Sequence, residues 1–368
     1  MTKNNSKMQP SRKYVTNLGL LSLAVVVFAL VRNHFDTKIP MRTLKNEDDR
    51  NSDVIILGGG HTGLSAALTL YRHQHDVVIF DTGKPRNLWD TPTHAFSGWE
   101  NKKTSDFKTK SRNELKSTGF VRFIDQEVIS VEKNNDSSFE VMTASGEQWQ
   151  SKKLLLAMGT EFVFPNISGY VENFPSNILH CLFTFGFDKR GSSSAGIIAM
   201  GHAASPFHTA ILVEDALKFA KKVTVYTNGD SSLVTEVKKM PGGADASYDS
   251  RIIKGFVKNP KGSSGIFIEF EDKEALFEDF LVHQPATRVN QGIVKQLGLE
   301  LDVRGDIATK PPFWQTTTSG VFAAGDCASP FKIISNALLM GANAGAGIAR
   351  ELPRRVTHNS VDRLANNV

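Results

Sequence analysis

The sequence predicts an α/β protein with two Rossmann-like three-layer domains, preceded by a hydrophobic helix near the N-terminus. Short apolar runs lead twice into a glycine-containing turn and a helix, which is typical of parallel β-α-β units. The chain has 368 residues, which is too long for one ordinary domain. A hydrophobic fraction of 40% and a charged fraction of 22% are typical of a globular chain with a substantial core.

Charge and cysteine content exclude several classes of protein. The net charge is +5, and the basic residues are scattered without forming a stripe, so we expect no nucleic-acid partner. Cys181 and Cys327 are the only cysteines, which excludes a disulfide-stapled scaffold and a four-cysteine metal site. The ten histidines show no zinc-ligand spacing, so we predict no metal centre.

An apolar run, Leu18–Val31, follows four basic residues between positions 3 and 13. With its flanks this run approaches the ~17–25 residues that span a bilayer, so residues 1–50 are predicted to form a membrane anchor and a linker. We expect a membrane-anchored protein, with the endoplasmic reticulum as one candidate membrane. A signal peptide cleaved after Ala29, followed by secretion, stays open as the alternative. Basic residues on both sides of the run leave the orientation open.

The first nucleotide-binding motif begins after the strand predicted at Asp53–Leu57. This strand runs into a GxGxxG turn over residues 58–63, and an Ala- and Leu-rich helix follows. Gly58 permits the turn, Gly60 lets the backbone approach a pyrophosphate, and Gly63 allows the helix to pack closely on the strand. A second predicted strand, ending at Phe80, is followed by Asp81 at the spacing of an acid that binds a ribose hydroxyl. The segment is therefore predicted to bind a dinucleotide.

Two further segments identify that dinucleotide. Thr316–Asp326 (TTTSGVFAAGD) is a strand that closes on Gly325 and Asp326, and a helix rich in Ala and Gly follows. The pattern resembles the segment of FAD-dependent two-domain reductases whose aspartate binds the ribityl chain. Leu154–Gly159 (LLLAMG) resembles the strand and turn that end their first FAD segment. We therefore predict FAD as the cofactor.

The order of these segments, from about Asp53 to Leu352, resembles the thioredoxin reductase family of the pyridine nucleotide-disulfide oxidoreductases. The stretch Asp81–Asn87 (DTGKPRN), followed by His94, is most similar to the gliotoxin-type dithiol oxidases. The resemblance implies an FAD-dependent oxidoreductase that forms a homodimer. It also implies an FAD-binding domain at residues 51–165 and 283–352, an inserted NAD(P)-binding-like domain at 166–282 and a tail at 353–368.

The predicted FAD site draws on the glycine motifs and on the resemblance. The motifs contribute Gly58, Gly60, Gly63, Gly159 and Gly325. The resemblance implies contacts from Gly59, His61, Thr62, Asp81, Thr82, Gly83, Lys84, Pro85, Arg86, His94, Val128, Asp326, Ile333 and Ile334.

The redox motif of the family is degraded in this chain. In place of Cys-x-x-Cys followed by an acid or histidine and Gly, the sequence reads Cys181-Leu-Phe-Thr184-Phe185-Gly. A dithiol relay needs two thiols within reach and a proton donor for the leaving sulfur. The resemblance places Thr184 against the flavin, so Thr184 and Cys181 are the candidate catalytic residues and a disulfide relay is not expected.

The second nucleotide motif is degraded as well. After the strand predicted at Ala195–Met200, the turn reads G-x-A-x-x-P, with Ala203 where backbone must approach a pyrophosphate and Pro206 where an N–H is needed. NADPH-dependent members of the family place arginines after the next strand, and Asn228-Gly-Asp230 stands there instead. We therefore predict that strong NADPH binding has been lost.

These departures predict an FAD-dependent oxidase or dehydrogenase that acts on a hydrophobic small molecule, in secondary-metabolite biosynthesis, with molecular oxygen as a candidate acceptor. Leu182, Phe183, Phe185 and Phe187 would give the substrate an apolar lining. Candidate proton acceptors are His180, His202, His208 and Asp188. Two alternatives stay open: an NAD(P)H-dependent flavin reductase that passes electrons to a partner protein, and a non-redox cyclase that binds FAD.

Overall fold

The structure is a computed structural model that describes residues 49–353, apart from residues 88, 90, 136, 263 and 273. The predicted membrane anchor, most of its linker and the tail after residue 353 lie outside these residues. Within the described part of the chain, no helix has the length and apolar character needed to cross a bilayer.

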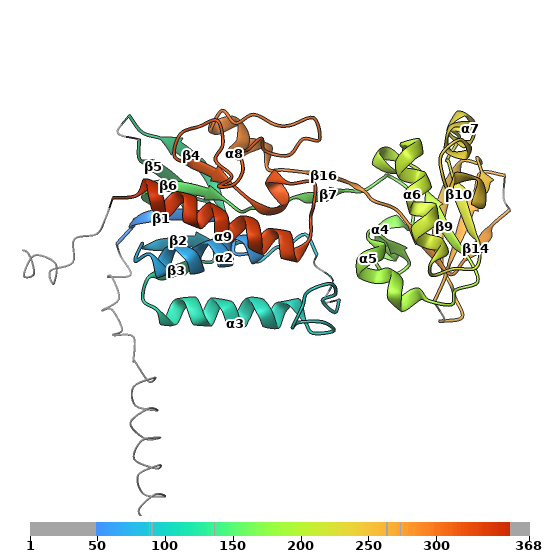
Figure 1. Cartoon of the computed structure of the whole chain (residues 1–368), viewed down its shortest axis with the longest axis horizontal. Helices are drawn as coiled ribbons and strands as arrows, with labels where there is room; N and C mark the ends of the chain where they lie inside the picture. Colours follow the sequence, from blue (N-terminus) through green and yellow to red (C-terminus); the bar gives the residue numbers. More distant parts are fainter. Residues whose placement is uncertain are drawn as a thin grey trace, which may run out of the picture. The chain divides into compact units, whose positions relative to one another are not determined.

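The larger sheet has seven strands and a mixed topology (Figure 1). Its strands are β1 (Asn51–Leu57), β2 (Val77–Phe80), β3 (Val121–Ile124), β4 (Val128–Lys133), β5 (Phe139–Thr143), β6 (Gln148–Leu156) and β17 (Val321–Ala323). The strand order is β3-β2-β1-β6-β5-β4, and β17 pairs with β6 in parallel. Parallel pairing of β3, β2, β1, β6 and β17 brings their carboxyl ends to one edge of the sheet.

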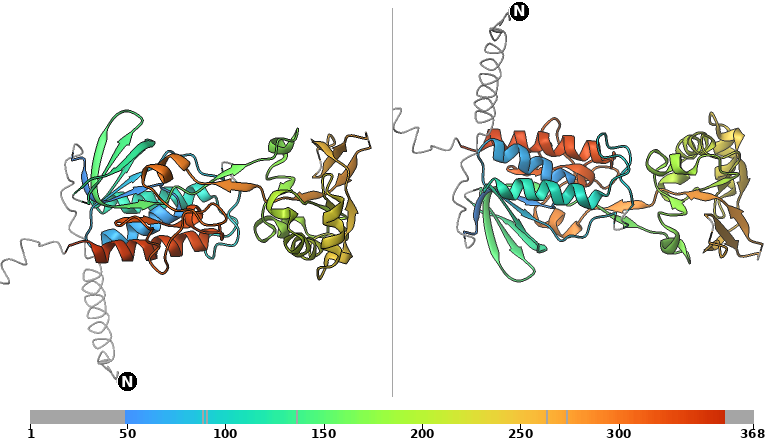
Figure 2. Two further views of the ribbon diagram at one scale, coloured as in Figure 1. Left: turned by 90° about the horizontal axis from the view of Figure 1, so that it is seen from above. Right: turned by 90° about the horizontal axis from the view of Figure 1, so that it is seen from below.

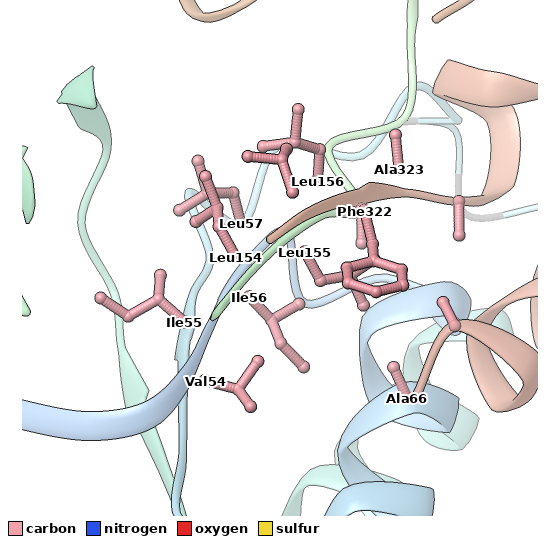
Figure 3. Close-up of a cluster of buried hydrophobic side chains, with 14 of the residues drawn as sticks. Val54, Ile55, Ile56, Leu57, Ala66, Leu154, Leu155, Leu156, Phe322 and Ala323 are labelled. Atoms are coloured by element: carbon pink, nitrogen blue, oxygen red, sulfur yellow. The ribbon is translucent and has the colours of Figure 1, made fainter. Parts of the chain in front are cut away.

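The core explains why the strands beside the predicted FAD site read as unbroken apolar runs. Val54, Ile55 and Ile56 of β1 are fully buried, as are Leu154–Leu156 of β6. Figure 3 shows these side chains together with Phe322 of β17 and Ala66 of α2. A parallel strand that is covered on both faces must be apolar at successive positions, since neither face meets water.

Three helices of the FAD-binding part lie beside one another in both views of Figure 2. They are α2 (His61–Arg72), α3 (Thr104–Ser117) and α9 (Ile334–Glu351). The helices α2 and α9 pack closely because α9 carries glycines at the contact: a Cβ on Gly341 would lie 2.3 Å from the carbonyl oxygen of Thr62. The middle of α9 therefore lies against the first turn of α2. Helix α8 (Gln291–Gln296) packs near β4.

The second sheet is formed by strands that lie between β6 and β17 in the sequence. It has five parallel strands in the order β11-β10-β9-β15-β8. They are β8 (Ile178–Leu179), β9 (Ala195–Ile198), β10 (Val223–Tyr226), β11 (Ser247–Asp249) and β15 (Phe280–Val282). Their helices are α4 (Tyr170–Asn173), α5 (Leu182–Phe185), α6 (Pro206–Leu217) and α7 (Ser231–Lys238).

Two smaller sheets complete the chain. An antiparallel sheet contains β12 (Ile253–Lys258), β13 (Ile266–Phe270) and β14 (Leu276–Glu278), and β7 (Glu161–Val163) pairs with β16 (Ala286–Arg288). The 3-10 helices are η1 (Gly186–Lys189), η2 (Gly201–Ala204), η3 (Gly243–Asp245) and η4 (Gly325–Ala328). The α/β class and its Rossmann-like sheets are as predicted, while the domain limits at residues 166 and 282 stay predictions.

Candidate active site

The turn after β1 is built around the Asp81 carboxylate. Gly58 has a φ of +111°, which favours glycine, and a Cβ on Gly59 would lie 2.4 Å from Asp81 Oδ2. The other carboxylate oxygen, Oδ1, accepts a 3.1 Å hydrogen bond from the Gly83 N–H. Asp81 therefore lies directly beside the glycine turn, in the position of an acid that binds a ribose.

Gly60 differs from its neighbours because no protein atom lies within 4 Å of a Cβ built on it. It is the N-cap residue of α2, so the first N–H groups of an apolar helix begin at this open position. Backbone donors at a helix N-terminus attract phosphate oxygens. The turn thus fits a pyrophosphate.

Arg86 and Asp326 join two distant segments of the site. Arg86 Nη2 donates a 2.7 Å hydrogen bond to Asp326 Oδ2, and the guanidinium packs over the ring of Phe162 at 4.6 Å from its centroid. The side chains are 13% and 21% exposed, so the pair is largely removed from water. Lys332 Nζ fixes the backbone beside it, donating to the carbonyl oxygen of Asp326 at 2.7 Å.

Several buried polar atoms near these residues have no hydrogen-bond partner among the described residues. They include His61 Nε2, Arg86 Nε and Thr160 Oγ1. An unsatisfied buried polar atom costs about 1–3 kcal/mol, so such atoms indicate a ligand that completes them. Burial, followed by the charge of Lys108, lowers the pKa of His61 to about 4, so its imidazole is neutral at physiological pH. The donor set and the open turn fit FAD.

The remaining predicted FAD residues lie in several separate segments of the chain. Residues 82–85 are exposed in the loop after β2 and His94 is half-buried later in that loop. Gly159 follows β6 with a φ of +66°, and Val128 is buried at the start of β4. Ile333 is the exposed N-cap residue of α9, and Ile334 begins that helix.

Comparisons with known proteins identify the family of this chain. Residues 52–184 match the pyridine nucleotide-disulphide oxidoreductase family. A thioredoxin reductase of Gibberella zeae is 34% identical over 335 residues, covering 82% of this chain and 97% of its own. Thioredoxin reductase sirT of Leptosphaeria maculans is 35% identical over 312 residues, covering 80% and 93%. This chain belongs to the thioredoxin reductase family.

A solved structure shows the same fold. The oxidoreductase from Agrobacterium tumefaciens is 26% identical, with a TM-score of 0.71 over 82% of this chain and 98% of that one. As a member of the thioredoxin reductase family, the chain is an FAD-dependent oxidoreductase.

The segment that carries the redox motif in this family is short and partly exposed. Cys181 is the N-cap residue of α5, and its carbonyl oxygen accepts the Phe185 N–H at 3.0 Å. Cys181 and Thr184 are half-buried, whereas the Phe183 side chain is 81% exposed. Both cysteines are free thiols. The segment thus keeps a helical turn but offers one thiol.

Cys327 cannot act as the missing second thiol. Its side chain is fully buried, and Sγ donates to the carbonyl oxygens of Leu156 and Ala324. Burial, reinforced by the charge of Asp326, raises the pKa of Cys327 to about 12. Because the thiolate is the nucleophile, this thiol is unreactive at physiological pH.

The candidate proton acceptors are not gathered at one place. The ring of His180 packs against Phe162, Phe174 and Phe185. Burial, followed by the charge of Arg86, lowers its pKa to about 3, which makes it a weak base. His202 is exposed, and His208 Nε2 donates to Gln284 Oε1 at 2.8 Å.

Asp188, the fourth candidate, is one end of a series of side-chain contacts, Glu100–His94–Asp188, that the sequence did not predict. His94 Nδ1 lies 2.6 Å from Glu100 Oε1, and His94 Nε2 lies 3.5 Å from Asp188 Oδ2. These contacts join the loop after β2 to η1. No local sequence pattern predicts the Glu100–His94 contact or the Arg86–Asp326 hydrogen bond. The first lies in an irregular loop, and the second joins residues that are distant in the sequence.

Proposed function

We propose that this enzyme oxidises a hydrophobic small molecule directly, without a dithiol relay, and that molecular oxygen is the final electron acceptor. The observation that carries the proposal is the redox segment itself. Thr184 stands at the position of the second thiol. The other cysteine of the chain, Cys327, is deeply buried and unreactive, so it cannot serve as a redox partner for Cys181. A disulfide relay lacks its second sulfur.

FAD, when bound, supplies the two-electron acceptor for this oxidation. The glycine turn after β1, Asp81 and Asp326 would hold the cofactor, and Arg86 positions the Asp326 carboxylate. The Thr184 hydroxyl can orient a substrate by hydrogen bonding but is a poor nucleophile without a neighbouring base. Phe183 and Phe187, in the same segment, have exposed aromatic rings, which favours a lipophilic substrate.

The biological setting extends this proposal. Resemblance to the gliotoxin-type enzymes supports a role in secondary-metabolite biosynthesis, and the predicted N-terminal anchor would bring the enzyme to a membrane, where lipophilic molecules concentrate. A homodimer is the assembly that the family resemblance implies.

Anaerobic spectroscopy of the purified, FAD-loaded full-length protein tests the proposal. We expect the visible absorbance of the oxidised flavin to persist with NADPH or dithiothreitol and to be lost with a member of a panel of lipophilic alcohols, amines and thiols. The flavin of the Cys181→Ser variant should be reduced by the substrate at the same rate as the flavin of the wild type. Rapid bleaching by dithiothreitol that disappears in Cys181→Ser would establish thiol chemistry and contradict the proposal. Loss of the flavin absorbance with NADPH would identify an NADPH-dependent reductase. Substrate turnover while the flavin stays oxidised would identify a non-redox cyclase.

A further inference from the structure

The second sheet places its carboxyl ends where a Rossmann-like domain binds a dinucleotide. β9 lies between β10 and β15, and the chain leaves β9 through α6 towards β10, while β15 and β8 lie on the other side. Ligands of such sheets bind at this reversal of strand order, in front of the helix that follows the first strand. In this domain the position is bounded by the turn after β9, the first turn of α6 and the residues after β15.

In the turn after β9, backbone N–H groups donate to carbonyl oxygens of the same turn. Residues 201–204 form the 3-10 helix η2, in which the Ala203 N–H donates to the carbonyl oxygen of Met200 at 3.1 Å. The Ser205 N–H donates to the carbonyl oxygen of His202 at 3.4 Å. Pro206, the first residue of α6, has no N–H to donate. The corresponding turn of the FAD-binding sheet passes from Gly60 directly into α2. Two backbone N–H groups of this turn, those of Ala203 and Ser205, therefore bond within the turn itself.

A side-chain hydrogen bond spans the same position. His208 lies in the first turn of α6 and Gln284 follows β15, and their side chains meet at 2.8 Å. Beside Gln284, the buried His283 Nδ1 accepts a 2.6 Å hydrogen bond from the Tyr170 hydroxyl. The His208–Gln284 bond joins the first turn of α6 to the residues after β15, two of the segments that bound this position.

The adenosine end of the position is negatively charged. The loop after β10 lies beside residue 250, because the Gly229 N–H donates to the carbonyl oxygen of Ser250 at 2.9 Å. The neighbouring cation, Arg251, makes a 2.6 Å contact with Asp249 and lies 3.5 and 3.6 Å from Asp272 and Glu274. Three carboxylates thus neutralise a guanidinium that could otherwise bind a 2′-phosphate.

We propose that the inserted sheet excludes NADH and NADPH, and that the His208–Gln284 hydrogen bond and the carboxylates around Arg251 are the residues that do so. The nucleotide cofactor expected from the fold does not fit the side chains present. This inference concerns binding to the inserted sheet alone, so it stands or falls independently of the substrate proposed above.

Direct binding to the FAD-loaded full-length protein tests it. Calorimetry with NADH and NADPH should give a wild-type Kd weaker than about 1 mM. The double variant His208→Ala/Gln284→Ala should bind NADH at least about tenfold more tightly than the wild type, because the position is opened. His202→Ala, which removes an exposed imidazole from the same turn, is the matched control and should leave binding unchanged.

Freeing Arg251 tests the adenosine end. Adding Asp272→Asn and Glu274→Gln to the open variant should improve NADPH binding about tenfold relative to NADH, since two carboxylates no longer oppose the 2′-phosphate. Micromolar binding of either nucleotide by the wild type would overturn the proposal. Unchanged affinity in an open variant whose thermal unfolding matches the wild type would overturn the assignment to His208 and Gln284. Gln284→Ala alone replaces the double variant if the latter does not fold.

Discussion

Arg86 and Asp326 lie 240 residues apart in the sequence, yet Arg86 Nη2 donates to Asp326 Oδ2 at 2.7 Å. The pair fastens the loop after β2 to η4 after β17, two segments that the sequence assigned to FAD separately. Because the whole second sheet lies between them in the sequence, this contact exists only once both ends of the chain have folded onto the larger sheet.

Removing Arg86 should destabilise the protein even without cofactor. Arg86→Ala leaves the mostly buried Asp326 carboxylate without this partner, so we expect the free energy of unfolding of the FAD-free protein to fall by about 1–3 kcal/mol. Urea denaturation measures this change. Arg190→Ala, which removes an exposed arginine packed over Phe187, is the control and should change stability by less than about 0.5 kcal/mol. Equal effects of the two variants would contradict this role for Arg86.

Adjacent glycines should respond differently to alanine. In Gly59→Ala the new methyl group would collide with Asp81, so both the stability of the FAD-free protein and FAD affinity should fall. Gly60→Ala meets open space in the protein, so stability should be kept while FAD affinity falls at least about tenfold. Fluorescence titration with FAD and thermal unfolding separate the two effects. A Gly60→Ala protein with wild-type FAD affinity would contradict the placement of the pyrophosphate.

Acid should destabilise the fold through buried histidines. Burial lowers the pKa of His180 to about 3 and those of His61 and His283 to about 4, from an ordinary value of 6.5. Because the unfolded state takes up these protons at a higher pH than the folded state, the three histidines leave stability unchanged above pH 6.5. They lower the free energy of unfolding progressively as the pH falls, towards 4 for His61 and His283 and towards 3 for His180. Each group contributes a slope of up to about 1.4 kcal/mol per pH unit.

His180→Phe isolates one of these groups, because phenylalanine fits the surrounding rings and does not titrate. Urea unfolding at pH 7 and pH 5 should show a smaller loss of stability in this variant than in the wild type. His73→Phe removes an exposed histidine and serves as the control. If both variants kept the acid sensitivity of the wild type, a neutral, buried His180 would be the wrong explanation.

Thr184→Cys should rebuild a redox-active pair. The substitution restores the Cys-x-x-Cys spacing, with Cys181 as the N-cap residue of α5 and the new thiol three residues later. After mild oxidation, thiol titration in denaturant should show that the variant has lost two thiols relative to its reduced form, while the wild type loses none. If the oxidised variant kept all its thiols, the segment would have lost the geometry as well as the sulfur.

Local sequence determined the nucleotide fold, and the resemblance of two further segments to FAD-dependent reductases identified the cofactor. The strand, glycine turn and helix at residues 53–72 specify one β-α-β unit through contacts between near neighbours, and Asp81 follows at a fixed spacing. The same reasoning identified Thr184 and Pro206 as departures from the family, because each changes a donor or thiol that the motif requires at that position.

Tertiary structure alone decided which distant side chains meet. No periodicity places Arg86 against Asp326, His208 against Gln284 or Arg251 near Asp272 and Glu274, since each pairing joins segments that only the folded chain brings together. It also decided that Cys327 is inert and His180 a weak base, because burial, not residue type, sets their pKa values. Sequence identifies the groups, and the packed fold fixes their surroundings and therefore their chemistry.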